Sequence, residues 1–186
     1  MAEAPDDITP DDKDWTWVLD SRCPECGFDA GAIDPAAVGL LIRDNASEWA
    51  LILAPASDRL RMRPSPDRWS ALEYAVHVRD VYVLYLERLD LMLTEDGPRY
   101  PDWDQDQTAI AERYNTQDPS EVNVELARAA EALAARFDGV TGDQWTRTGY
   151  RSDGASFTVD SFSRYLAHDP VHHIWDVTGS RSAQDR

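Results

Sequence analysis

The chain is 186 residues long, with 42% hydrophobic residues and a formal net charge of −17 at pH 7. This length favours a single domain with a sizeable buried core. The acidic balance argues against nucleic acids and anionic membrane surfaces as partners, because both are negatively charged.

The N-terminus lacks the basic region and apolar stretch of a secretory signal. No apolar run in the chain approaches the roughly 18 residues that a membrane span needs. We therefore expect a cytoplasmic protein. Residues 1–14 contain six acidic side chains and predict a disordered, solvated tail.

Residues 15–34 predict an ordered N-terminal lobe, which contains Cys23-Pro-Glu-Cys26-Gly27. In a cytoplasmic protein we expect these cysteines to be reduced or metal-bound rather than joined in a disulfide. Their spacing is half of a zinc knuckle, but no second Cys or His pair lies nearby in sequence. Three interpretations stay open: a reduced turn, a second metal site completed by acidic groups or His173, and a redox or nucleophilic thiol.

The first two long helices have clear start signals. Asp34-Pro35 predicts a helix with Asp34 as its N-cap and an end near Pro55. Ser70-Ala-Leu-Glu73 is a capping box, which predicts a second helix that continues to about Thr94.

The next segment predicts one loop, one short helix and one long helix. Residues 98–104 follow a Gly-Pro pair and are expected to form a loop. A short helix is expected from Gln105 to Tyr114. Asp118-Pro119 then predicts a third long helix that ends at Gly139.

The last helix follows a region rich in turn residues. Residues 141–157 contain three glycines and fit a short hairpin or an irregular loop. Thr158 with Ser161 predicts the cap of a fourth long helix, Val159 to about Val177, and Gly179 is its expected stop.

Four long amphipathic helices joined by loops are typical of an all-α four-helix bundle. The predicted organisation is an acidic tail (1–14), a lobe with the cysteine pair (15–34), the bundle (35–178) and a C-terminal tail (179–186).

All four histidines lie in the second and fourth predicted helices. His168 and His172 are four residues apart, so a helix places both on one face. If His77 converges on that face, the three imidazoles form the facial set of a catalytic divalent metal with an open position. His173 is rotated by about 100° from His172 and is left out of this set.

The competing interpretation is that these are ordinary histidines of helix surfaces or the core. Their clustering favours the metal, although the pair lacks the glutamate of the zincin motif. Pro170 lies between the paired histidines and predicts a kink. Carboxylates close in sequence could orient the imidazoles through their second ring nitrogens: Glu73, Asp80, Asp169 and Asp176.

Two segments of this chain resemble the DinB superfamily. Trp69-Ser70…Glu73…His77 is similar to its second-helix signature, and His168-x-x-x-His172-His173 resembles its fourth-helix signature. The resemblance covers residues 35–178. It implies an up-down-down-up bundle of DinB-like topology, here with an extra N-terminal segment, and a divalent metal, zinc or nickel, on His77, His168 and His172. Cys23-x-x-Cys26 and Asp169-Pro170 depart from the broad pattern.

The resemblance also implies a class of function. Relatives include mycothiol-dependent maleylpyruvate isomerase, bacillithiol transferases and a metal-dependent hydrolase, and many pair as homodimers. We therefore expect a metal-dependent thiol S-transferase or isomerase that acts on small electrophiles. One lysine stands against seventeen arginines, a bias typical of GC-rich bacterial genes, which favours mycothiol as the thiol. The alternatives are a metal-dependent hydrolase and a non-catalytic metal-binding stress-response or ligand-binding protein.

Overall fold

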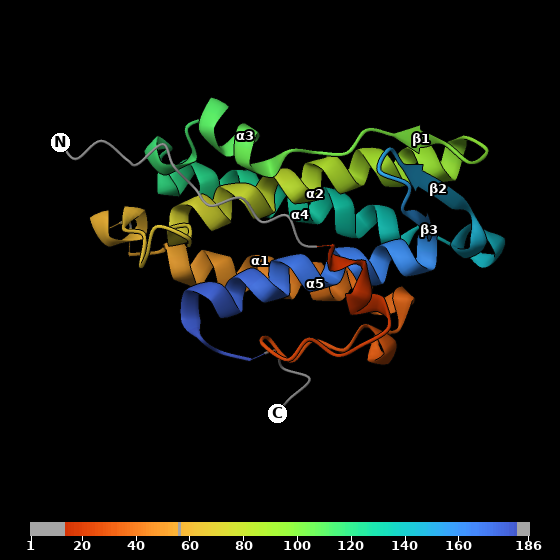
Figure 1. The fold of residues 1–186 in the computed structure, drawn as a ribbon, viewed down its shortest axis with the longest axis horizontal. Coiled ribbons are helices and arrows are strands. Elements are labelled where there is room, and N and C mark those ends of the chain that lie inside the picture. The colour runs from red at the N-terminus through yellow and green to blue at the C-terminus, as the bar shows by residue number, and fades with distance from the viewer. Residues whose placement is uncertain (1–13, 56, 182–186) are drawn as a thin grey trace.

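The computed structural model describes residues 14–55 and 57–181. Its four long helices pack side by side (Figure 1): α1 (Val38–Leu53), α2 (Ala71–Thr94), α4 (Pro119–Asp138) and α5 (Val159–Thr178). The all-α four-helix prediction is confirmed. Most of the expected acidic tail, residues 1–13, lies outside the described residues. Within the described ranges, no helix combines the length and apolarity that a bilayer crossing requires.

Local capping explains where α2 and α5 begin. The Ser70 hydroxyl accepts from the Glu73 backbone N–H, and the Glu73 carboxylate accepts from the Ser70 N–H. Thr158 and Ser161 form the same reciprocal arrangement at the start of α5. Both boxes satisfy backbone donors that a helix leaves unpaired at its first turn. Gly179 ends α5 in the left-handed conformation, with φ 69°.

The remaining helix ends agree with the predictions except in two places. Asp34 caps a 3₁₀ turn, η3 (Pro35–Ala37), and α1 begins only after it. The short helix α3 (Gln105–Ala111) stops before the expected Tyr114. The reason is Arg113, whose left-handed φ of 51° breaks the helical path. Further 3₁₀ turns are η4 (Asp58–Arg61), η5 (Tyr114–Thr116) and η6 (Gly142–Thr146).

A small sheet covers one end of the bundle. Strands β2 (Thr148–Arg151) and β3 (Ser156–Thr158) form an antiparallel hairpin, one of the two structures that the turn residues fit. Strand β1 (Arg99–Tyr100) pairs with β2 in parallel, where the sequence predicts a loop. Two residues are too few to show strand alternation, and their partners lie about fifty positions away in the chain.

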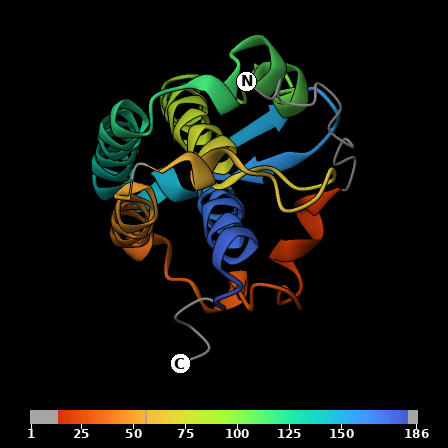
Figure 2. The same ribbon diagram turned by 90° about the vertical axis from the view of Figure 1, so that its left-hand side faces the viewer.

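The helices alternate around the bundle. α1 packs against α4 and α5, and α2 packs against the same two helices, so α1 and α2 lie diagonally opposite (Figure 2). The core includes Trp49, Leu72, Leu89, Leu126, Leu133 and Phe162. A buried polar chain links three helices: the Tyr82 hydroxyl donates to Asn45 (2.7 Å), and Asn45 donates to the Pro170 carbonyl (2.9 Å). α5 continues through Pro170 as one helix.

The N-terminal lobe lies along α5. Its 3₁₀ turns η1 (Trp15–Leu19) and η2 (Ala30–Ala32) both contact this helix. A separate small core joins the two parts, and its buried members are Cys23, Cys26, Phe28, Ala30 and Ala167. The lobe therefore forms an outer layer on α5 rather than a fifth member of the bundle (Figure 2).

Candidate metal centre

A cavity of about 440 Å³ lies where α2, α5 and the N-terminal lobe meet, and all four histidines of the chain contribute to its lining. α2 supplies His77, and α5 supplies His168, His172 and His173. The lobe contributes Trp15 and Glu25. Segments far apart in sequence thus bring their imidazoles to one place.

The first cluster in this cavity consists of His77, Asp169 and His173, whose ligand atoms all lie within 4.8 Å of one another. His77 Nε2 is 3.4 Å from Asp169 Oδ2, and His173 Nε2 is 3.2 Å from Asp169 Oδ1. The edge-on contact between the two imidazoles has a centroid distance of 5.0 Å. One carboxylate therefore bridges imidazoles from two helices.

His77 is held by aromatic rings rather than by a hydrogen-bond acceptor. Its side chain is 1% exposed, stacks on Trp103 with a centroid distance of 5.3 Å, and meets the edge of Trp69 at 5.2 Å. Among the described residues, neither of its ring nitrogens has a hydrogen-bond partner, and Asp169 Oδ2 has none. Buried polar atoms without partners are unusual and call for an explanation.

His173 is oriented by a second carboxylate. Its Nδ1 lies 2.9 Å from Asp176 Oδ2, while its Nε2 faces Asp169. Burial disfavours a charge on His173, but the two carboxylates outweigh it and raise the pKa of His173 to about 10. Burial also opposes ionisation of Asp169, yet His173 and His77 hold its pKa well below the usual value. Asp169 and Asp176 therefore favour a positive charge at the His173 ring.

The second cluster consists of Cys23, Cys26, His168 and His172, all buried and within the same 4.8 Å limit. Cys23 Sγ lies 3.6 Å from His172 Nδ1. Burial, together with the neighbouring His172, lowers the pKa of His168 to about 4. Burial raises the pKa of the Cys26 thiol to about 12, which is the wrong direction for a nucleophilic thiol.

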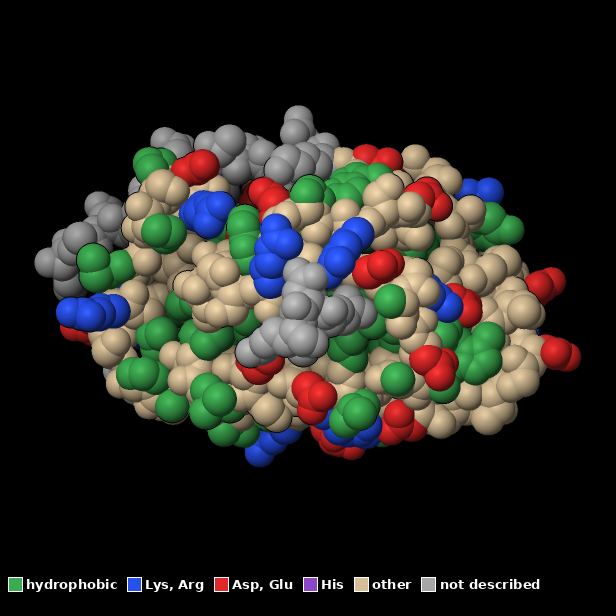
Figure 3. Space-filling view, turned by 90° about the horizontal axis from the view of Figure 1, so that it is seen from below, with side chains coloured by type: hydrophobic (Ala, Val, Ile, Leu, Met, Phe, Trp, Pro, Cys, Tyr) green, Lys and Arg blue, Asp and Glu red, His purple; other side chains and the backbone are tan. Residues whose placement is uncertain are grey.

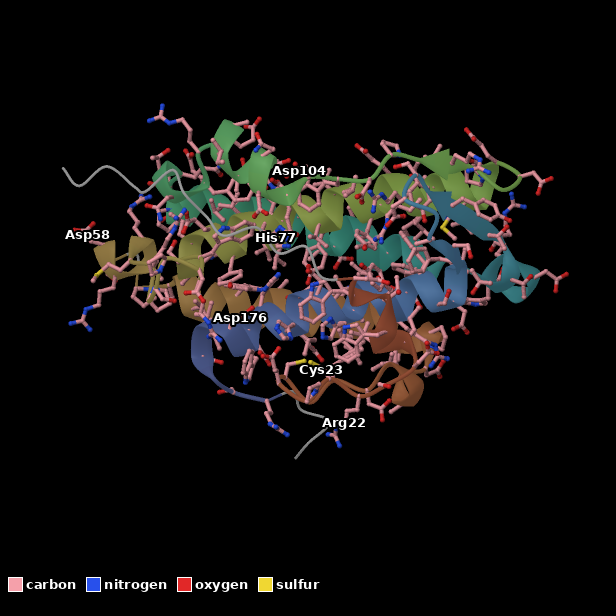
Figure 4. The ribbon with its side chains drawn as sticks, in the orientation of Figure 1. Arg22, Cys23, Asp58, His77, Asp104 and Asp176 are labelled. Carbon is pink, nitrogen blue, oxygen red and sulfur yellow. The ribbon has the colours of Figure 1, made fainter. Side chains whose placement is uncertain are left out.

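The structure divides the predicted ligands His77, His168 and His172 between these two clusters. His77 meets Asp169 and His173, whereas His168 and His172 meet the cysteines. Figure 4 shows His77 on one side of α5 and Cys23 on the other. Metal binding by the predicted set of three stays a prediction, but the three side chains do not share one cluster.

Sequence reasoning did not group His173 and Asp169 with His77, because α5 carries two i,i+4 pairs. His168 and His172 form one, and Asp169 and His173 form the other, about 100° around the helix. The sequence signal for this second pair is the spacing Asp-x-x-x-His, with Asp176 about one turn after His173. This signal identifies a candidate ligand pair only when the structure shows which pair faces α2 and His77.

The other predicted acceptors have different partners. Glu73 binds Arg63 and the Ser70 backbone, and Asp80 binds Arg79 and Tyr114. Asp176 does orient an imidazole, but that of His173.

A divalent metal fits the cluster of His77, Asp169 and His173. Two atoms bound to one tetrahedral zinc ion at about 2.1 Å lie about 3.4 Å apart, close to the 3.4 Å and 3.2 Å contacts of Asp169. The unpartnered nitrogens of His77 supply the lone pair that a metal ligand needs. Asp176 holds the second nitrogen of His173, as carboxylates do for metal-bound histidines.

Comparisons with known proteins agree with this architecture. YfiT from Bacillus subtilis, described as a probable metal-dependent hydrolase with an unusual four-helix bundle topology, superposes with a TM-score of 0.71 at 19% identity, covering 80% of this chain and 87% of YfiT. The mycothiol-dependent maleylpyruvate isomerase gives a TM-score of 0.63 at 10% identity. A point mutant of the isomerase gives 0.65 at 13%.

Each isomerase comparison covers 84% of this chain and 65% of the isomerase chain. At these identities the likeness establishes the fold alone.

No curated protein sequence matches the chain significantly. The family model described as the DinB superfamily matches residues 43–177, most of the chain. This protein therefore belongs to the DinB superfamily.

Proposed function

We propose that this protein is a metal-dependent enzyme that activates a low-molecular-weight thiol of the mycothiol type for attack on a small electrophile. The observation that carries the proposal is the cluster of His77, Asp169 and His173, whose side chains line a cavity of about 440 Å³. The His77 nitrogens and Asp169 Oδ2 have no hydrogen-bond partner among the described residues. Two imidazoles and one carboxylate are a ligand set of catalytic zinc sites that keep a position open.

The ligand set suits zinc or nickel. When bound, such an ion lowers the pKa of a thiol or water at its open position and so supplies a nucleophile at neutral pH. The chain's own residues prepare the site. Asp169 bridges His77 and His173, and Asp176 fixes the His173 ring. Trp103 and Trp69 pack on His77 and exclude water from that side.

Arg88 offers a binding group for a carboxylate or other anionic group of the electrophile. It lines the cavity with Arg68 and Arg151, beside six acidic residues: Glu25, Asp67, Asp102, Asp106, Asp169 and Asp176. Arg151 is already paired with Asp102 and Asp153. Arg88 is 5% exposed, and its Nε has no hydrogen-bond partner among the described residues. Its guanidinium lies 4.9 Å from the Tyr100 ring centroid and donates to the Pro101 carbonyl.

The length of the cavity suits a thiol and an electrophile bound together. His77 and Arg88 are eleven residues apart on α2, which is about 16 Å along the helix axis. Both line the same cavity. A carboxylate held at Arg88 would leave room for a reactive carbon nearer to His77.

The test is turnover by the zinc- or nickel-loaded protein with mycothiol and a carboxylated electrophile such as maleylpyruvate. We expect conversion of the electrophile that needs both the metal and the thiol. The thiol is consumed if it stays in the product and is regenerated if the reaction is an isomerisation. The Asp169→Asn variant should lose at least about 100-fold in rate, since it removes the bridging charge. The matched control is Asp160→Asn on the same helix, where Asp160 pairs with Arg164 at the surface. This variant should keep full rate.

Two outcomes would overturn the thiol chemistry. Metal-dependent cleavage of esters or amides at the same rate with and without thiol would make the protein a hydrolase. Tight metal binding with no turnover of thiol or water substrates would make it a binding protein. Equal rates for Asp169→Asn and Asp160→Asn would remove the cluster from the active site.

A further inference from the structure

Cys23 and Cys26 from the N-terminal lobe and His168 and His172 from α5 form a four-residue cluster apart from the proposed active-site cluster. Their ligand atoms lie within 4.8 Å of one another. All four side chains are buried, with exposures of 1%, 0%, 4% and 7% in that order. The cysteines and the histidines are about 145 positions apart in the sequence, yet the fold brings two sulfur atoms and two nitrogen atoms together.

The local sequence explains how the two cysteines and the two histidines are each brought close together. Gly27 adopts φ 79° and its N–H donates to the Cys23 carbonyl, closing a tight turn. The Cys23 N–H donates to the Phe28 carbonyl across the same turn. On α5, the spacing of four residues stacks His168 and His172 on one face. Cys-x₂-Cys with His-x₃-His is the ligand spacing of structural zinc sites.

We propose that Cys23, Cys26, His168 and His172 bind a structural zinc ion that fastens the N-terminal lobe to α5. A tetrahedral zinc ion with Zn–S bonds of about 2.3 Å and Zn–N bonds of about 2.0 Å separates its ligand atoms by about 3.3–3.8 Å. Cys23 Sγ and His172 Nδ1 are 3.6 Å apart, inside that range. His168 Nε2 is buried and has no hydrogen-bond partner among the described residues.

The surroundings are those of a closed site. The rings of Trp15 and Phe28 pack on His168 with centroid distances of 5.4 Å and 5.7 Å. The other nitrogen of His172 faces carboxylates, with Glu25 Oε2 at 3.7 Å and Asp176 Oδ2 at 3.9 Å. Figure 3 views the molecule from the side of the lobe, and no histidine side chain is visible among the described residues at the surface there. His168 and His172 also line the large cavity, but four protein ligands would fill a tetrahedral zinc ion and leave it no open position for substrate.

A reduced turn or a reactive thiol explains these observations less well. Both cysteines are free rather than joined in a disulfide, and neither is exposed enough to meet a substrate or an oxidant. Binding of zinc would release the two thiol protons to solvent and leave both sulfurs as thiolates. It would also give the unpartnered His168 nitrogen a ligand bond.

This zinc would shape the proposed active site without taking part in its chemistry. Trp15 and Glu25 of the lobe line the large cavity, so fastening the lobe fixes one wall of that cavity. His172 of the closed cluster adjoins His173 of the open one. The proposal does not depend on which reaction the open cluster performs.

Cobalt substitution tests the proposal directly. The full chain loaded with Co²⁺ should show thiolate-to-cobalt charge-transfer absorption, because two sulfurs bind the ion. The zinc form should release one zinc per chain when a mercurial reagent has titrated two thiols, as read by a chromogenic chelator. Absence of the charge-transfer band in folded, cobalt-loaded protein would overturn the proposal.

Variants separate ligand loss from general damage. Cys23→Ser/Cys26→Ser should abolish the charge-transfer band and lower the metal content by one ion per chain. Phe28→Leu disturbs packing in the same small core but removes no ligand, so it should keep both band and metal. His77→Ala should also keep the band. Loss of the band in His77→Ala, or its persistence in the double cysteine variant, would contradict the site.

Discussion

Adjacent residues of α5 serve different clusters, and this division is the main feature of the site at the scale of single residues. His168 and His172 face the lobe, whereas Asp169 and His173 face α2. Helical phasing predicts that His168 and His172 share a face, and they do. It does not say which neighbour that face meets, because the packing around α5 is a property of the whole fold.

Arg88 provides a residue-scale prediction about the substrate. Replacing it by Met should raise KM for a carboxylated electrophile about tenfold or more, since a charge-assisted hydrogen bond contributes about 1.5–3 kcal/mol. We expect kcat to change little. Steady-state kinetics measures both, with a neutral electrophile as the internal comparison. An equal loss with the neutral electrophile would show that Arg88 has a structural role instead.

The ion pair of Arg63 and Glu73 gives a second residue-scale prediction. Glu73 is 3% exposed, accepts from Arg63 Nε at 2.9 Å, and also caps α2. Arg63→Ala leaves this buried carboxylate without its partner and should destabilise the protein by about 3 kcal/mol. The exposed Arg59→Ala is the control, with a change within about 0.5 kcal/mol. Denaturant unfolding measures both, and equal midpoints would refute the expectation.

The same pair predicts how stability depends on pH. Burial opposes ionisation of Glu73, but Arg63 and Ser70 hold its pKa below the usual value. A lowered folded-state pKa stabilises the protein above the unfolded value of about 4.3, and this stabilisation is lost as pH falls through the folded value. Wild type should therefore lose stability below about pH 4.3 more steeply than Glu73→Gln. Parallel curves of unfolding free energy against pH would rule this out.

At the scale of elements, α1 and α4 approach closely at Gly39. A Cβ there would lie 2.2 Å from Asp138 Oδ1 and 3.0 Å from the Ala134 carbonyl oxygen. Gly→Ala inside a helix usually stabilises by about 0.5–1 kcal/mol. Here we expect Gly39→Ala to destabilise by about 1–3 kcal/mol instead. Asp138→Ala removes the nearer of these two contacts, so the double variant should recover part of this loss. Thermal unfolding of wild type, the two single variants and the double variant measures the recovery.

Elements with local signals could be predicted from the sequence, and those that rest on distant partners could not. The capping box at Ser70 and Glu73 locates the start of α2 because both hydrogen bonds lie within four residues. β1 exists because Arg99 and Tyr100 pair with β2 far along the chain. Likewise, the sequence shows Cys23 and Cys26 only as half of a zinc knuckle. The two histidines that lie beside them come from α5, far along the chain.

At the scale of the whole molecule, the N-terminal lobe completes a site that the bundle begins. The bundle brings His77 on α2 to Asp169 and His173 on α5. The lobe covers the other face of α5 and contributes Trp15 and Glu25 to the cavity. The two proposals therefore assign two metal ions to one helix, an open one toward α2 and a closed one toward the lobe.

The most direct test of this account is the metal content and absorption of cobalt-loaded His173→Ala. Because His173 belongs to the open cluster, the variant should bind one ion per chain where wild type binds two, and it should keep the thiolate charge-transfer band. His168→Ala should lose the band. A His173→Ala protein that keeps both ions, or that loses the band while His168→Ala keeps it, would contradict the assignment.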